Sequence, residues 1–208
     1  YKTGKSITDK VNTLLYKSNN VGINWSPNTI FNWVGDGGNL NLNIRTFTDL
    51  QNAIGLVTGT LTLNQNVAMT AKEAADFTNG ITINKDIAID GKGHTIDAKN
   101  LGRIFSIGEG FTVTLTNATL INGKATEGGA IINNGKLVVD NSAFEDNAAN
   151  YYGGAIFNWD DLQVTNSAFD GNDILVRNIR AMDNVDHGGA AIYNWKNGKL
   201  DISKSNFT

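Results

Sequence analysis

The sequence predicts an all-β chain that folds as a right-handed parallel β-helix, and three observations lead to this prediction. A glycine-rich motif recurs in the second half of the chain, apolar residues alternate between its copies, and Asn outnumbers even the 23 Gly. Gly and Asn adopt the left-handed backbone of tight turns more readily than other residues. A chain rich in both is expected to have many turns between short strands.

The repeated motif sets the length of one coil, by which we mean one turn of the β-helix. Gly-Gly-Ala-Ile-Ile-Asn-Asn at 128–134 recurs 25 residues later as Gly-Gly-Ala-Ile-Phe-Asn-Trp at 153–159. It returns at 189–195 as Gly-Ala-Ala-Ile-Tyr-Asn-Trp, with one Gly replaced by Ala. An alternating apolar strand and a Ser/Asn corner with a Phe follow each copy. Such a unit cannot enclose its own apolar face, but stacked units bury it continuously.

Stacking coils at about 4.8 Å places like residues on one another. Alternation directs Ile156, Leu162, Val164 and Phe169 to the interior. Two columns are expected to run through the stack, and their members are Phe144, Phe169 and Phe207, and Asn133, Asn158 and Asn194. Side-chain amides in such a column can hydrogen-bond along it.

An antiparallel meander is the alternative fold. Asn134-Gly135 and Asn197-Gly198 lie between apolar runs, and Asn-Gly is a strong hairpin signal. A meander, however, gives no reason for Phe, Asn and Gly-Gly to recur at one phase, so the parallel helix is favoured.

Fainter coils precede the clear ones. Leu61 and Leu63 are expected to belong to the first coil of the β-helix. An insertion over 173–186 is expected before the last repeat, which begins later in the sequence than the period predicts. The apolar pairs assigned to the coils between are Ile87 and Ile89, Phe105 and Ile107, and Val113 and Leu115, with Leu120 at the Phe position.

The chain is expected to divide into an N-terminal cap or accessory segment, 1–45, and a β-helix, 46–208. Capping-box patterns predict short helices over 48–54 and 70–77 that cover the N-terminal side of the β-helix. An apolar stripe predicts another helix over 6–16. Leu40, Leu42 and Ile44 alternate as a strand.

The C-terminal coil shows no cap in the sequence. The chain stops at Phe207-Thr208, inside a repeat. Either the sequence is a piece of a longer helix, or a partner covers this end. In the second case, end-to-end self-association through the uncapped coil would build a filament.

Composition narrows the function. Apolar residues make up 40% and charged residues 18% of the chain, and no run approaches the roughly 18 apolar residues of a membrane-spanning helix. The net charge of -3 and pI of about 5.3 give no reason to expect a nucleic-acid partner. The chain has no Cys, which excludes disulfides and thiolate metal sites.

Several motifs carry a family resemblance. They lie at 47–54, 80–87, 89–97, 103–105, 144–147 and 169–172. The segment from Phe47 to Thr208 resembles the adhesin-like surface proteins of methanogenic archaea. Its repeats are similar to the Gly-Gly-Ala-Ile and Phe-x-x-Asn repeats of chlamydial polymorphic outer-membrane proteins. The resemblance implies a parallel β-helix, an extracellular location at the cell surface, and a role in attachment or surface structure.

A polysaccharide lyase or hydrolase is a further alternative, because many functions share this fold. A hydrolase needs two carboxylates that face one sugar bond. Asp160 and Asp161 are adjacent, so they should point to opposite faces of a strand. His94 and His187 are expected in turns. Asp183 and Asp186, with Arg177 and Arg180 nearby, are expected to be solvated charges of the insertion. The sequence therefore predicts no enzyme, no metal site and no cofactor.

Aromatic residues form the candidate binding site. If Ile156 points inward, the next residue points outward, and an exposed column results. The expected binding residues are Ile132, Phe157, Tyr193, Trp159, Trp195, Tyr151 and Tyr152. Exposed aromatic rings suit stacking on sugar rings or on a protein, so a glycan or a surface protein of another cell is the expected partner. Burial of the rings beneath the insertion or the N-terminal segment is the alternative.

Three sequons predict glycosylation, at Asn24, Asn117 and Asn206. Pro27 weakens the first. Asn117 is expected at an outward corner and is the best of the three.

Overall fold

The computed structural model describes residues 31–34, 39–175 and 188–208, with side chains from residue 43 onward. The chain separates into two compact units, residues 1–43 and 44–208. In the first unit, β1 (Phe31–Val34) pairs antiparallel with β2 (Asn39–Leu42), which confirms a strand at Leu40 and Leu42. Ile44 belongs to the second unit and is buried. The helix predicted over 6–16 lies outside the described residues.

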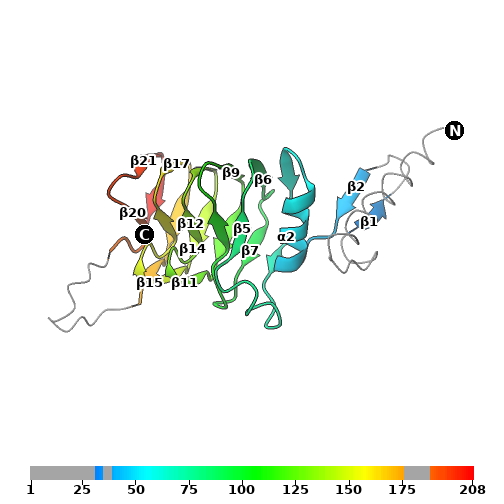
Figure 1. Ribbon diagram of the computed structural model, residues 1–208, viewed down its shortest axis with the longest axis horizontal. Coiled ribbons are helices and arrows are strands. Elements are labelled where there is room, and N and C mark those ends of the chain that lie inside the picture. Colours follow the sequence, from blue (N-terminus) through cyan, green and yellow to red (C-terminus); the bar gives the residue numbers. More distant parts are fainter. Residues whose placement is uncertain (1–30, 35–38, 176–187) are drawn as a thin grey trace. The chain divides into compact units, whose positions relative to one another are not determined.

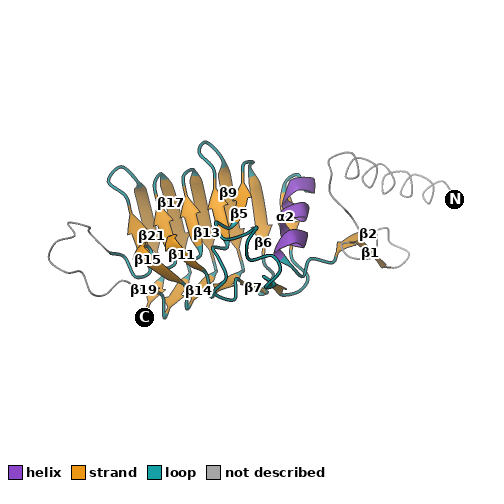
Figure 2. Ribbon diagram, turned by 60° about the horizontal axis from the view of Figure 1, so that its bottom comes forward, coloured by secondary structure: helices purple, strands orange, loops and turns teal. Residues whose placement is uncertain are grey.

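The second unit is a parallel β-solenoid whose described strands form four sheets (Figures 1 and 2). We number these sheets I to IV in the order in which the chain passes through them in each coil. A coil that has no strand in sheet III passes directly from sheet II to sheet IV. Each strand pairs in parallel with the equivalent strand of the next coil. This pairing confirms the predicted all-β solenoid and excludes the antiparallel meander for the unit.

The strand bounds follow the coils. Sheet I contains β3 (Thr60–Thr62), β6 (Ile87–Asp90), β9 (Thr112–Thr116), β13 (Lys136–Asp140), β17 (Asp161–Thr165) and β21 (Lys199–Ser203). Sheet II contains β4 (Val67–Ala68), β7 (Thr95–Asp97), β10 (Thr119–Ile121), β14 (Ala143–Glu145), β18 (Ala168–Asp170) and β22 (Asn206–Phe207). Sheet III contains β11 (Lys124–Glu127), β15 (Ala148–Tyr152) and β19 (Asp173–Ile174). Sheet IV contains β5 (Ile81–Ile83), β8 (Phe105–Ile107), β12 (Ile131–Asn133), β16 (Ile156–Asn158) and β20 (Ile192–Asn194).

The core consists of apolar columns in register. Leu162 pairs with Leu137 on one side and Leu200 on the other, and the same alignment holds for every residue of β17. The ring of Phe169 stacks on Phe144 with centroids 4.8 Å apart and on Phe207 at 4.7 Å. The predicted interior positions of the middle coil, including Leu162 and Phe169, are buried. The weaker coils are confirmed as well, because their predicted apolar pairs from Leu61 to Leu120 are buried.

Asparagine ladders accompany the apolar columns. The amide of Asn133 donates to Oδ1 of Asn158 at 2.7 Å, and the amide of Asn158 donates to Oδ1 of Asn194 at 2.7 Å. This confirms the predicted ladder. A second ladder, which the sequence analysis did not predict, joins Asn147 to Oδ1 of Asn172 at 3.0 Å.

Glycine is required where neighbouring coils approach most closely. Gly153 has φ 62°, in the left-handed region, and a Cβ atom on Gly154 would collide with the carbonyl oxygen of Ala190 in the next coil. Ala190 replaces this second Gly in the third copy of the motif, where its side chain is exposed. The Gly-Gly corner is therefore a contact between backbones.

Helix α2 (Phe47–Leu56) covers the edge of the solenoid formed by the first strands (Figure 2). Its capping box joins Thr46 to Asp49, two residues before the predicted Thr48 box. Phe47, Leu50, Ala53 and Ile54 form its buried face. The prediction of a short helix here is confirmed, with an earlier start.

The second predicted helix, over 70–77, is wrong, because this segment forms turns. Its Thr70 and Glu73 do interact, with the Thr70 hydroxyl 2.7 Å from the Glu73 carboxylate. The other carboxylate oxygen of Glu73 accepts from the Thr48 hydroxyl at 2.6 Å and from its main-chain N–H. Instead of capping a second helix, Glu73 therefore connects the turn to α2 through hydrogen bonds. Phe77 in the same segment packs edge-on against Phe47 of α2.

Candidate functional site

An aromatic cluster lies where sheet IV and its following turns meet β15. The cluster forms because the strands pair in register, which places Ile132, Phe157 and Tyr193 beside one another on successive strands β12, β16 and β20. Trp159 and Trp195 each follow the last Asn of their strand. Tyr151 and Tyr152 end β15.

The rings of the cluster contact one another closely. Phe157 stacks on Tyr193 with centroids 5.5 Å apart and planes 6° from parallel. The Trp159 and Trp195 centroids are 4.7 Å apart. Tyr152 bridges the group, 4.6 Å from Tyr193 and 5.9 Å from Phe157. The structure therefore brings together the six aromatic residues that the sequence analysis selected, with Tyr151 6.5 Å from Tyr152.

Exposure within the cluster differs from the prediction at one residue. Phe157 was expected to be exposed, and this is wrong, because its side chain has no exposed surface. Rings of Tyr152, Trp159, Tyr193 and Trp195 surround it. Phe157 is thus the packed centre of the cluster. The accessible surface comes from Trp159, which is 38% exposed, and from half-buried neighbours that include Tyr193, Trp195 and Ile132.

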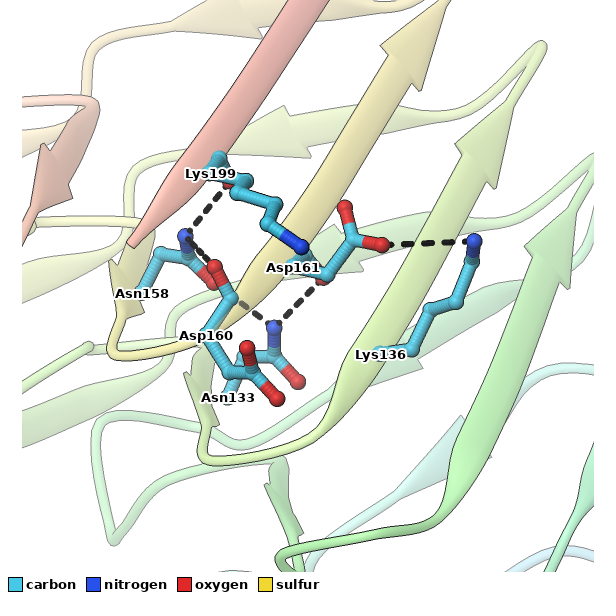
Figure 3. Close-up of polar contacts among 6 residues, drawn as sticks. All are labelled: Asn133, Lys136, Asn158, Asp160, Asp161 and Lys199. Carbon is cyan, nitrogen blue, oxygen red and sulfur yellow. Dashed lines mark hydrogen bonds and ion pairs between the residues drawn. The ribbon is translucent and has the colours of Figure 1, made fainter. Parts of the chain in front are cut away.

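Main-chain hydrogen bonds to the preceding coil anchor the backbones of the two tryptophans. The main-chain N–H of Trp159 donates to the main-chain carbonyl of Asn133, and the main-chain N–H of Trp195 donates to that of Asn158, both at 2.8 Å. Inside the turn, the Asn158 amide lies 3.1 Å from the Asp160 carbonyl (Figure 3). Because both Trp backbones are tied to buried strands, the cluster presents a preorganised surface.

Charged residues border the same turns. The Asp161 carboxylate forms an ion pair with Lys136 at 3.3 Å, on the neighbouring strand of sheet I (Figure 3). Asp160 is exposed. One of the two adjacent carboxylates is therefore already neutralised by a lysine.

The candidates for catalysis and metal binding are dispersed. His94 lies in a turn as predicted, with its N–H 2.8 Å from the carbonyl of Gly91. Asp183, Asp186, Arg177, Arg180 and His187 lie outside the described residues. Within the described ranges, no group of three or more His, Cys, Asp and Glu side chains is arranged to hold a metal ion.

The sequons have different environments. Asn117 lies at a corner with φ 52°, and its amide donates to Asp90 at 2.9 Å while its Oδ1 accepts from Asn141 at 2.8 Å. It lines a groove of about 530 Å³ that crosses four coils. Asn206 in β22 is exposed, and Asn24 lies outside the described residues. Glycosylation at each of them stays a prediction, and Asn206 is the more accessible of the two described asparagines.

Searches with the whole chain find no relative. No protein-family model matches it, and no curated protein or solved structure does so significantly. No helix in the described part of the chain is long and apolar enough to cross a membrane. The structure accordingly assigns the chain by its fold alone: the described part of residues 44–208 is a parallel β-solenoid.

Proposed function

We propose that the chain is an extracellular, adhesin-like module of a cell surface that attaches through its aromatic cluster to a glycan or surface protein of another cell. The observation that carries this proposal is the rigid, partly exposed pair Trp159 and Trp195. Aromatic side chains supply a large contact area at little entropic cost and dominate the energy of many interfaces. The family resemblance of the repeats supports the location and the attachment role.

A glycan is the partner that we favour for this site. The exposed Trp159 and the half-buried Trp195 and Tyr193 offer apolar surface, and the neighbouring Asp160 and Lys199 are exposed polar groups. A sugar has both apolar ring faces and hydroxyl groups. The cluster therefore offers a surface of matching chemistry.

The test is a glycan array probed with the wild-type protein and with Trp159→Ala. Loss of one stacked Trp is expected to weaken binding about tenfold or more, as for a central aromatic anchor. Phe111→Ala, which removes a half-buried aromatic ring from a different turn, is the matched control and should bind normally. Binding that survives Trp159→Ala and Trp195→Ala unchanged would refute the proposed site.

We also propose that the protein acts without catalysis, against the alternative of a polysaccharide lyase or hydrolase. Incubation with plant, algal and wall polysaccharides, with and without calcium, should release no product. Product release that disappears in Asp183→Ala or Asp186→Ala would instead show an enzyme whose site includes the predicted insertion.

Self-association through the C-terminal coil is the second candidate function. It is supported by three apolar side chains, Leu200, Ile202 and Phe207, which are 39%, 38% and 43% exposed. Their equivalents in the preceding coil, which include Leu162 and Phe169, are buried. Helix α2 covers the opposite edge of the solenoid, so a head-to-tail filament would have to displace that helix. Contact between two C-terminal coils needs no such rearrangement.

A further inference from the structure

A polar pocket of about 340 Å³ lies beside sheet III, and none of its lining residues belongs to the aromatic cluster. Its lining includes Asn79, Asn100, Arg103, Lys124, Thr126 and Asn150. None of the lining residues is acidic. Lys124 and Asn100 are exposed at its margin, whereas Arg103 is only 8% exposed.

The guanidinium of Arg103 is held by main-chain oxygens. Nε donates to the carbonyl of Gly128 at 3.0 Å, Nη1 to that of Asn79 at 3.0 Å, and Nη2 to that of Glu127 at 2.8 Å. None of the ion pairs among the described residues involves Arg103 or Lys124. A buried charge is normally paired, because carbonyl dipoles offset only part of the lost hydration.

The charge state and the remaining donors favour an anion. Burial lowers the pKa of the Arg103 guanidinium, and attraction to the Glu127 carboxylate opposes that shift. The group still remains protonated near neutral pH, since a free guanidinium titrates far above it. Arginine has five N–H donors and three are used, so Nη1 and Nη2 each keep one N–H.

Amide groups complete the pocket. The side chains of Asn79, Asn100 and Asn150 make no hydrogen bond within the described chain, in contrast to the ladder asparagines. Amides both donate and accept, which suits the hydroxyl groups of a sugar. The volume is at the lower end of the range for small-molecule sites, about 300–1,000 Å³.

We propose that this pocket binds the anionic group of an acidic saccharide, either a uronic acid carboxylate or a sulfate ester. Arg103 and Lys124 supply the charge, and the three amides contact the sugar hydroxyls. Planar guanidinium groups bind carboxylates and sulfate-like oxyanions with parallel hydrogen bonds. The site is separate from the aromatic cluster, so it does not depend on the function proposed for the cluster.

Titration calorimetry at low salt tests the proposal with sodium glucuronate and glucose 6-sulfate as probes and glucose as the neutral control. One or both acidic sugars should bind saturably, and glucose about tenfold more weakly or not at all, as expected when charge-assisted hydrogen bonds are absent. Which acid binds identifies the anionic group. The absence of saturable binding by either acid would overturn the proposal.

Variants locate the binding. Lys124→Glu should abolish it, and because Lys124 is exposed, this change leaves the fold intact. Lys196→Glu, an equal charge change at an exposed turn outside the pocket, should have little effect. Arg103→Lys retains the charge but loses the paired N–H donors of the guanidinium, so it should weaken binding. Its circular dichroism spectrum should match that of the wild type, which checks that the variant is folded. Trp159→Ala should bind the acidic sugar normally, which separates this site from the aromatic cluster. Equal binding by Lys124→Glu and the wild type would refute the assignment.

Discussion

Asn158 shows at the scale of one residue how a polar side chain can belong to the core. It has no exposed surface, its Oδ1 accepts from Asn133, and its amide lies within 3.1 Å of oxygens of Asn194, Asp160 and Lys199. Removal of one member of such a group leaves its buried partners unsatisfied, at a cost of about 1–3 kcal/mol each. The ladder therefore tolerates loss of a member poorly.

We expect Asn158→Ala to lower the free energy of unfolding by more than about 2 kcal/mol, because two ladder partners lose their bonds. Asn172→Ala is the matched comparison. Asn172 also belongs to a ladder, but its side chain is only half-buried, so water can replace part of what is lost. Urea denaturation of both variants measures the difference, and an equal loss would contradict the role of burial.

We expect Phe169→Ala to cost about 3–5 kcal/mol, the range for a buried Phe. Its ring is 1% exposed and lies between Phe144 and Phe207. Phe207→Ala is the control and should cost clearly less, because that ring is 43% exposed. A loss below about 1 kcal/mol for Phe169→Ala would mean that the cavity closes without penalty.

At the scale of elements, the Gly-Gly corners join one coil to the next through the backbone. A Cβ on Gly154 would lie 2.7 Å from the carbonyl oxygen of Asp173 and would also collide with that of Ala190. Because both obstacles are main-chain atoms, neither can move away without shifting the backbone of the next coil.

We accordingly expect Gly154→Ala to be strongly destabilising, by about 1–3 kcal/mol or more, as for overpacking of a close contact. Gly55→Ala is the control, since no atom lies within 4 Å of its added Cβ in α2. That change should be neutral or stabilising by about 0.5–1 kcal/mol through helix propensity. Thermal unfolding of both variants measures this difference in stability. Equal stability of Gly154→Ala and Gly55→Ala would mean that the Gly-Gly corner can widen to admit a Cβ atom.

Glu73 ties the turn over 70–77 to helix α2. Burial raises the pKa of its carboxyl, but hydrogen bonds from Thr48 and Thr70 outweigh that and hold the pKa below its usual value of 4.5. A carboxyl whose pKa is lower in the folded state stabilises the protein above the unfolded pKa. That stabilisation is lost as the pH falls through the folded pKa.

We therefore expect the wild-type protein to lose stability as the pH falls below about 4.5, in part through Glu73. Glu73→Gln should be less stable near neutral pH and should show a shallower loss on acidification. Denaturant melts at a series of pH values between 6 and 3 measure both. A parallel decline in the two proteins would show that Glu73 does not contribute to the pH dependence.

At the scale of the whole solenoid, the two edges differ. Helix α2 buries its apolar face on the first coil, whereas β21 and β22 expose Leu200, Ile202 and Phe207. Strand edges of this kind pair readily with another chain. For the proposed self-association, this asymmetry favours contact between two C-terminal coils over head-to-tail stacking.

If the protein self-associates through its C-terminal coil, we expect it to form dimers rather than filaments. Ile202→Lys should then make it monomeric. Sedimentation at increasing concentration, with electron microscopy, distinguishes these states. Lys199→Glu, a change on the same exposed strand at an already charged position, serves as control. A wild-type protein that remains monomeric at high concentration would exclude this association.

The sequence by itself determined the solenoid, the Phe column, the Asn133–Asn158–Asn194 ladder and the grouping of the aromatic residues. The physical reason is registry: equivalent residues of successive coils lie beside one another, so a repeat in the sequence states directly which side chains touch. Only the tertiary structure decided features that depend on residues at different phases of the repeat. These include the burial of Phe157 beneath its neighbours, the turn that replaced the helix over 70–77, and the pocket that joins Arg103 to Lys124. No period relates such residues, and their contacts arise only where the turns of adjacent coils meet.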